Sequence, residues 1–325
     1  MKRKYLSHQT TTRYASLKMR IEVRLGGLAT LLTLTLVAFI CVFTAYSNAE
    51  AQHPIDVQRA STSGEHFKAL TTYLLLPTRR LTNDTRVAAA KSSWALGLHR
   101  LATEEIDGLL RDKTIDGDER ARLTFMRGVI DYQEERYQEA RLYAEKAISL
   151  LKGPSPLRAR AHLLWGQAAM RMKVYGGAEE HLRIAFEEAD NSDLPEVNYS
   201  LGEVQMRLGK LPDAESHFKA IPMDHDRTPM AVRHLAAIAL ESSDLDKAKF
   251  WLDKGRSEFP EAFIDSWADY GAVQVAITRG DMYTARLTTE AAVKKYPPSD
   301  PWLLLMQASL EKGEWDRRAQ LGRDR

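Results

Sequence analysis

Five alanines recur along the chain at nearly constant spacing, and this repeat constrains the fold more than any other feature of the sequence. They are Ala140, Ala178, Ala214, Ala248 and Ala285, which lie 38, 36, 34 and 37 residues apart. Each alanine closes a six-residue motif, and the five copies read ERYQEA, KVYGGA, GKLPDA, SDLDKA and GDMYTA. A period of this length indicates a repeat array, in which each copy is one small unit that packs on its neighbours.

The segments that flank each motif have the spacing of helices. Leu123, Met126, Val129 and Ile130, for example, fall on one helical face, and most prolines of the body lie between such segments. A small residue stands twelve positions before four of the alanines, where it would let a second helix approach the first closely; these residues are Gly128, Gly166, Gly202 and Ala236. The sequence therefore predicts helix pairs over about 121–153, 159–191, 195–224, 229–260 and 266–298, with a sixth copy that begins at Pro301.

This pattern resembles the tetratricopeptide repeat (TPR), in which two antiparallel helices pack around small residues. The resemblance is clearest where Trp165-Gly166 is followed by Ala178 and Ala185. It implies an all-α fold, a right-handed α-solenoid of five to six helical hairpins over residues 119–325. Residues 64–118 are predicted to be helical as well, as a cap or a degenerate repeat, and Trp94 to Gly97 is similar to the start of a further copy.

Residues 25–46 form an uncharged, apolar segment that is long enough to cross a bilayer as one helix. The preceding residues 1–24 carry a net charge of +6, so the positive-inside rule predicts a basic cytoplasmic tail and an extracytoplasmic body, most simply in a bacterial periplasm. The lipid bilayer is then a partner through residues 25–46, and residues 47–63 are expected to be a polar linker. An alternative stays open, because Ala49-Glu50-Ala51 matches a signal-peptidase site and cleavage after Ala51 would release an exported soluble protein.

Composition and motifs argue against several classes of function. Outside the basic tail the chain has a net charge of −4, which disfavours nucleic acid as a partner. The only cysteine, Cys41, lies within the apolar segment, so the body has no disulfide and no thiol catalyst. The nine histidines include no pair at i, i+4, and no Gly-rich phosphate loop or G-x-S-x-G motif occurs. We therefore predict no catalytic residue, no cofactor and no metal site.

The first helices of such an array line a concave groove, and helical spacing indicates which side chains face it. The predicted lining is Phe125, Tyr132, Arg160, Gln167, Met170, Arg171, Tyr199, Glu203, Met206, Arg207, Arg233, Trp267, Tyr270 and Gln274. Aromatic, Met and Arg side chains of this kind are enriched at protein interfaces. Tyr199 is expected to be only partly buried between Arg171 and Arg207, where it would hold an apolar anchor beside an acidic residue of a peptide.

These observations predict a non-enzymatic scaffold or adaptor that binds a protein or peptide partner on the extracytoplasmic side of a membrane. The resemblance implies a role in assembling an envelope complex. Two alternatives remain. A periplasmic holdase-like chaperone would use the same groove with low selectivity, and a substrate-holding subunit of an envelope enzyme would use the repeats as a frame. The second is disfavoured because residues 52–115 are too few for a typical catalytic core.

Overall fold

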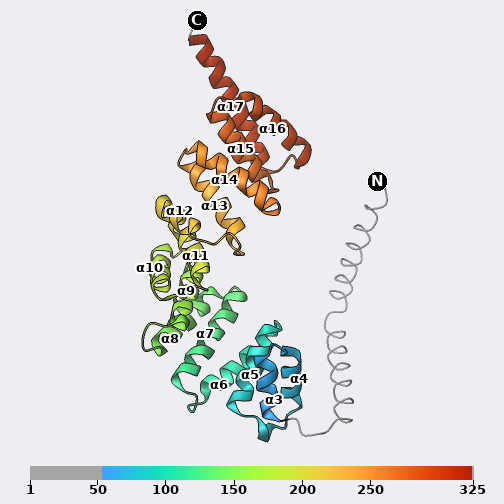
Figure 1. Ribbon diagram of the computed structural model, residues 1–325, viewed down its shortest axis with the longest axis vertical. Helices are drawn as coiled ribbons and strands as arrows, with labels where there is room; N and C mark the ends of the chain where they lie inside the picture. The colour runs from blue at the N-terminus through green and yellow to red at the C-terminus, as the bar shows by residue number, and fades with distance from the viewer. Residues whose placement is uncertain (1–52, 324–325) are drawn as a thin grey trace, which may run out of the picture. The chain divides into compact units, whose positions relative to one another are not determined.

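A computed structural model describes residues 53–323, and every regular element in that range is a helix. The predicted membrane span over 25–46 and the basic tail lie outside the described residues. Within residues 53–323, none of the helices combines the length and the apolar character that a membrane crossing requires. The chain divides into two compact units, Met1–Leu109 and Leu110–Arg325, which are described separately (Figure 1).

The described part of the first unit is a small helical cluster. It contains α3 (Pro54–Thr62), α4 (His66–Leu75), the 3-10 turn η1 (Thr78–Arg80), α5 (Asn83–Ala95) and most of α6 (His99–Arg111). Its core is made of Val57, Leu70, Tyr73, Leu76, Ala88 and Ala89. The Tyr73 hydroxyl donates a hydrogen bond to Glu105 at 2.7 Å, and Arg86 pairs with the same carboxylate at 2.9 Å. Residues 64–118 were predicted to be helical, and α4, α5 and α6 lie within that range.

Two predictions for this region were wrong. The linker expected over 47–63 is a helix from Pro54 onward, because Pro54 occupies the first helical turn, where proline needs no hydrogen-bonded N–H. Its Val57 is fully buried, so this helix belongs to the core. Trp94 to Gly97 does not start a repeat but closes α5: Gly97 adopts a left-handed backbone (φ 72°), and its N–H donates to the Trp94 carbonyl.

The second unit is a stack of helix pairs that lie where the sequence repeat predicts them (Figure 1). The pairs are α7 (Gly117–Gln133) with α8 (Tyr137–Leu150), α9 (Pro156–Arg171) with α10 (Tyr175–Glu188), α11 (Leu194–Arg207) with α12 (Leu211–Lys219), α13 (Thr228–Glu241) with α14 (Leu245–Glu258), and α15 (Ser266–Thr278) with α16 (Met282–Lys295). The short η2 (Pro260–Phe263) follows α14, and α17 (Pro301–Arg323) packs on the last pair. The all-α prediction is thus confirmed for this part of the chain.

The motif alanines are completely buried within the helix pairs. All five have an exposed fraction of 0%. Opposite them lie the small residues of the first helices: a Cβ atom on Gly166 would come within 2.6 Å of Leu182, and one on Gly202 would come within 2.6 Å of the Phe218 ring. The alanine spacing therefore reflects a steric requirement, since a larger side chain on either helix would push the pair apart.

The turn inside each pair is built the same way. Its first residue has a left-handed backbone, with φ between 58° and 78°; these residues are Glu135, Lys173, Gly209, Ser243 and Gly280. The N–H of the next residue donates to a carbonyl five positions earlier, as from Val174 to Ala169 at 2.9 Å. This hydrogen bond ends the first helix and aims the second back along it. Each left-handed residue is also the first letter of the six-residue motif.

Candidate functional site

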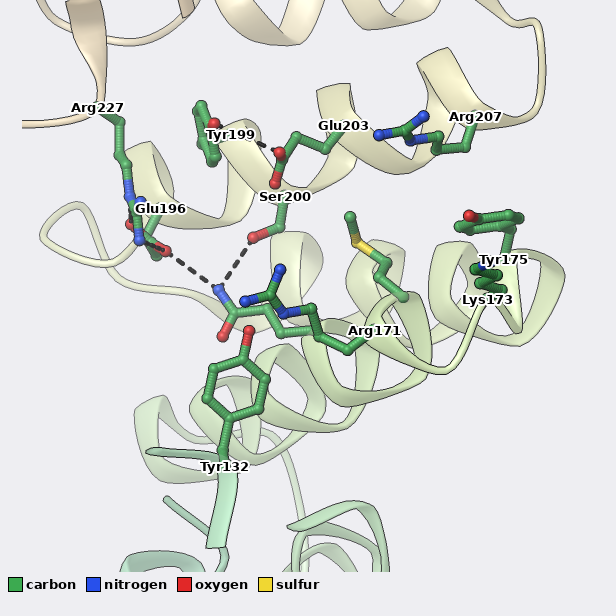
Figure 2. A pocket seen from close by; sticks show the side chains of 12 residues that line it. Tyr132, Arg171, Lys173, Tyr175, Glu196, Tyr199, Ser200, Glu203, Arg207 and Arg227 are labelled. Carbon is green, nitrogen blue, oxygen red and sulfur yellow. Dashed lines mark hydrogen bonds and ion pairs between the residues drawn. The ribbon is translucent and has the colours of Figure 1, made fainter. Parts of the chain in front are cut away.

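A pocket of about 470 Å³ lies in the second unit, between the first helices of three consecutive pairs (Figure 2). Most of its lining comes from α7, α9 and α11. Lys173 lies in the turn between α9 and α10, Tyr175 is the first residue of α10, and Arg227 directly precedes α13. The lining residues are Tyr132, Gln167, Met170, Arg171, Lys173, Tyr175, Glu196, Tyr199, Ser200, Glu203, Arg207 and Arg227. The volume lies within the range typical of ligand-binding sites, and the lining is mostly polar.

Half of the predicted groove residues line this pocket. Those that line it are Tyr132, Gln167, Met170, Arg171, Tyr199, Glu203 and Arg207. Of the other five lining residues, Lys173, Tyr175 and Arg227 lie at or beyond helix ends, where no helical periodicity applies, and Glu196 and Ser200 lie within α11. One signal in the sequence did mark Lys173: it begins a turn motif whose equivalent position is glycine in two other copies.

Internal contacts fix one end of the pocket. Arg227 donates two hydrogen bonds to the Glu196 carboxylate, at 2.7 and 2.8 Å, and its guanidinium lies 5.0 Å from the centre of the Tyr199 ring. Gln167 donates from its amide to Glu196 and to Ser200, both at 3.1 Å (Figure 2). Glu196 and Arg227 therefore largely neutralise one another, and this end of the pocket is preorganised by the protein itself.

Tyr199 departs from its predicted role. It was expected to be a partly buried anchor, but its exposed fraction is 7% and its ring packs edge-on against Phe218. Its hydroxyl lies 3.3 Å from Glu203 Oε1 on the same helix and 3.3 Å from His234 Nε2 of the next repeat, so partners within the fold already satisfy it. The expectation of partial burial was therefore wrong, and Tyr199→Ala is expected to destabilise the fold. Removing this ring would open a cavity at the junction of two repeats.

The charge of the pocket is positive on balance. Burial raises the pKa of Glu203, whose carboxylate accepts from the Tyr199 hydroxyl and lies near Arg207. Arg171 lies over the Tyr137 ring at 5.6 Å. Within residues 53–323, neither Lys173 nor Arg207 makes a side-chain hydrogen bond or an ion pair. Three cationic side chains therefore line the pocket beside two carboxylates, of which Glu196 is already paired with Arg227.

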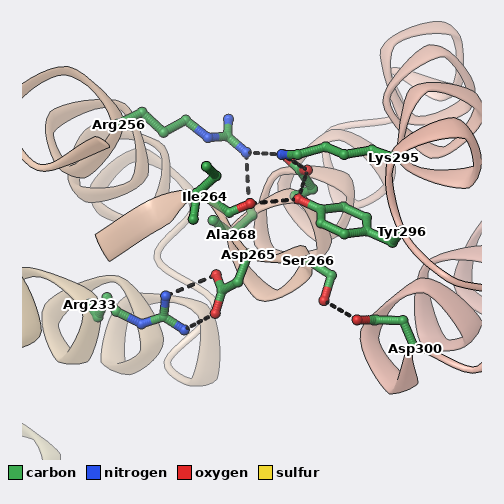
Figure 3. A network of polar contacts seen from close by, with 10 residues as sticks. Arg233, Arg256, Ile264, Asp265, Ser266, Ala268, Lys295, Tyr296 and Asp300 are labelled. Atoms are coloured by element: carbon green, nitrogen blue, oxygen red, sulfur yellow. Dashed lines mark hydrogen bonds and ion pairs between the residues drawn. The ribbon is translucent and has the colours of Figure 1, made fainter. Parts of the chain in front are cut away.

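The remaining predicted groove residues do not line the pocket, and most of them join successive repeats. Arg160 pairs with Asp193 at 2.6 Å, and Gln274 donates to Ser309 at 2.8 Å. Arg233 pairs with Asp265 at 2.9 Å (Figure 3). Its guanidinium also lies over the Trp267 ring at 4.3 Å. The others pack against neighbouring side chains. Tyr270 packs against Trp302, Phe125 packs on the buried cluster that contains Leu164, and Met206 packs on the buried cluster that contains Phe218. Each polar partner lies about one repeat further along, which explains why helical projection alone could not tell these residues from open groove residues.

Two histidines, the buried His162 and the partly buried His234, give a prediction for pH. Burial lowers the pKa of His162 to about 4, with His181 and Arg158 adding to the effect, and burial lowers the pKa of His234 to about 4 beside Arg207 and Arg233. The unfolded chain takes up these protons near pH 6.5, whereas the folded chain resists them down to about pH 4. Stability is therefore expected to fall as the pH drops from 6.5 to 4, by at most about 3 kcal/mol for each imidazole.

Urea unfolding at pH 7, 6, 5 and 4.5 measures this loss. The double variant His162→Gln, His234→Gln should show a flatter dependence over the same range, because neither amide titrates. If the stability of the double variant falls as steeply with pH as that of the parent, groups other than these two histidines cause the acid sensitivity.

Comparisons with known proteins identify the class of fold. No family model matches the chain, and no curated protein is similar to it in sequence. The fold is similar to solved TPR structures. PilW, described as a widely conserved type IV pilus biogenesis factor, aligns with a TM-score of 0.54 and 16% identity over 69% of this chain and 98% of its own. A TPR protein of Parabacteroides merdae aligns with a TM-score of 0.52 and 16% identity over 73% and 88%.

PilF of Pseudomonas aeruginosa aligns with a TM-score of 0.50 and 18% identity, over 64% of this chain and 94% of its own. The fold of this chain is therefore a tetratricopeptide-repeat fold, as the alanine spacing predicted. At these identities the likeness extends to the fold alone.

Proposed function

We propose that this protein is a non-enzymatic scaffold that holds a segment of a partner protein in the pocket between α7, α9 and α11. One observation carries the proposal: the pocket spans three repeats and presents Arg171, Lys173 and Arg207 to the solvent, while its other charges are paired internally. Repeat arrays use surfaces of this kind to bind extended segments. The specific ion pair at one end also favours a selective adaptor over a holdase-like chaperone, which would need a broad apolar surface.

We propose further that the body acts on the extracytoplasmic side of a membrane and assists the assembly of an envelope complex. The support is the uncharged segment over 25–46 with its basic flank, and the fold shared with PilW, whose description is that of a pilus biogenesis factor. A reporter that is active only outside the cytoplasm, fused after Arg325, is expected to be active. If that reporter is inactive, while a reporter that works only in the cytoplasm is active when fused at the same position, this location is contradicted.

A capture experiment tests the scaffold role. The full chain is expected to retain a discrete partner from the cells that make it, and Arg171→Glu with Arg207→Glu should weaken retention about tenfold or more, because two of the three positive charges that face the ligand are reversed. The matched control reverses two cations away from the pocket, Arg183→Glu with Lys249→Glu, whose side chains are more than half exposed. Equal loss in both variants would mean that net charge, not the pocket, governs binding.

A further inference from the structure

The last helix of the array runs straight through a sixth copy of the turn motif. Residues 313–318 read GEWDRR, in step with GDMYTA of the fifth copy, and share its glycine and the acidic residue that follows. In the five earlier pairs the first motif residue is left-handed and the chain turns there. Gly313 instead lies inside α17, which continues to Arg323 and projects beyond α15 and α16 (Figure 1). The sixth copy is therefore one long helix instead of a hairpin.

Two large side chains explain why this copy does not fold back on itself. Seven positions before the turn residue, four of the earlier pairs carry glycine or alanine, whereas the sixth copy carries Met306. Five positions after it, the earlier pairs carry the buried motif alanine, whereas the sixth copy carries Arg318. A hairpin at Gly313 would press these two side chains together and bury a guanidinium. The outer face of α17 is thus left uncovered by residues 314–323 of its own chain.

That outer face carries a seam with the spacing of a coiled coil. Five residues follow one another at intervals of three and four: Leu305, Ala308, Lys312, Trp315 and Ala319. The first four are exposed, and the exposed fractions of Leu305 and Trp315 are 45% and 69%. The buried face of α17, with Leu303 and Met306, packs on the fifth pair from the other side of the helix. A seam of this kind buries its apolar side chains only against another helix.

We infer that a second copy of this chain covers the seam, with its own α17 packed antiparallel on the first. The pattern is self-complementary about Gly313, as a twofold interface requires. Ala308 of one helix falls opposite Ala319 of the other, so the helices approach closely there. Lys312 falls opposite Trp315, where the ammonium meets the face of the indole ring. Each contact occurs twice, and none of them involves a residue of the pocket.

The flanking charges favour the antiparallel orientation. Glu311 and Arg318 border the seam on the same side, and antiparallel helices bring each of them opposite the other. In a parallel pair Glu311 would instead face Asp316, and Lys312 would face its own equivalent, so like charges would meet. The Arg318 side chain is 77% exposed and lies 3.3 Å from Glu314 on its own helix, which leaves it accessible to a second copy.

Sedimentation of the full chain in detergent micelles measures the association. Few large apolar side chains are buried, so we expect a dissociation constant of about 10 µM. Trp315→Ala should weaken association about tenfold or more, because the largest side chain of the seam is lost. Glu311→Arg should weaken it as well, and adding Arg318→Glu should restore it. The matched control is Tyr283→Ala, which removes another exposed aromatic side chain, on α16, and should associate like the parent.

Cysteine crosslinking tests the orientation. In a Cys41→Ser background, a copy with Ala308→Cys and a differently tagged copy with Ala319→Cys should form a mixed disulfide. Two copies with Ala308→Cys should not, because eleven residues of helix, about 16 Å, separate these positions in an antiparallel pair.

Three results would overturn the inference. A chain that stays monomeric at about 100 µM has no such interface. If Trp315→Ala associates as tightly as the parent, the copies meet through another segment, such as residues 25–46. Crosslinks between two Ala308→Cys copies, without any between Ala308→Cys and Ala319→Cys, would show a parallel arrangement. In each case the scaffold role proposed for the pocket is unaffected.

Discussion

Replacing Ala178 by arginine is expected to lower the free energy of unfolding by about 3 kcal/mol or more. Ala178 has an exposed fraction of 0%, and its carbonyl would lie 3.2 Å from a Cβ placed on Gly166. The contact between α9 and α10 leaves no room for a longer side chain, and the guanidinium would be buried without a partner. Because neighbouring repeats share interfaces, the damage should spread along the second unit. Thermal or urea unfolding followed by circular dichroism measures the loss.

Glu180→Arg is the control for this variant. It introduces the same side chain two positions further along α10, on an exposed face, and should leave the unfolding transition almost unchanged. A parent-like transition for Ala178→Arg would mean that the two helices do not pack through this alanine, and that the repeat register derived from its spacing is incorrect.

Replacing Asp131 by alanine is expected to cost about 3–5 kcal/mol. Asp131 is fully buried at the end of α7, where its carboxylate pairs with Arg127 and accepts from Arg136 Nε at 2.8 Å. The Arg127 side chain has an exposed fraction of only 13%, so removing the carboxylate takes an ion-pair partner away from a largely buried charge. Breaking one side of a buried pair in this way costs far more than the pair contributes.

The exposed pair of Lys249 and Asp253 provides the comparison. Both side chains are more than half exposed, so Asp253→Ala removes a contact of similar length at little cost. Double-mutant cycles with Arg127→Met would show whether the loss at Asp131 comes from that pairing. If Asp131→Ala unfolds like the parent, the carboxylate is not buried as described.

The sequence predicted the helix pairs of the second unit well because their spacing follows from a local steric rule. A helix pair packs closely only where small residues meet, so Ala140 or Ala178 marks the contact in the sequence itself. The described part of the first unit has no recurring small residue of this kind to indicate where its helices meet. Pro54 could open a helix or sit in a linker, and only the burial of Val57 against α4 and α5 decides between them.

The pocket was predictable only in part, for a different reason. Helical spacing identifies the inner face of a first helix, and that argument found Gln167 and Arg171. It could not tell whether a side chain on that face meets solvent or the next repeat, as Arg233 and Tyr199 do. It also could not place Arg227, which reaches the pocket from the segment between two repeats.

Site-specific photo-crosslinking tests the central claim most directly. A benzophenone side chain at Met170, which lines the pocket, is expected to capture a discrete partner in cells, and the same group at Leu142, half exposed on α8, is expected to capture none. Adding Arg171→Glu and Arg207→Glu to the protein that carries benzophenone at position 170 should abolish the crosslink to the partner. A partner crosslinked from Leu142 and never from Met170 would contradict the account, because it would place binding on the second helices instead of in the pocket.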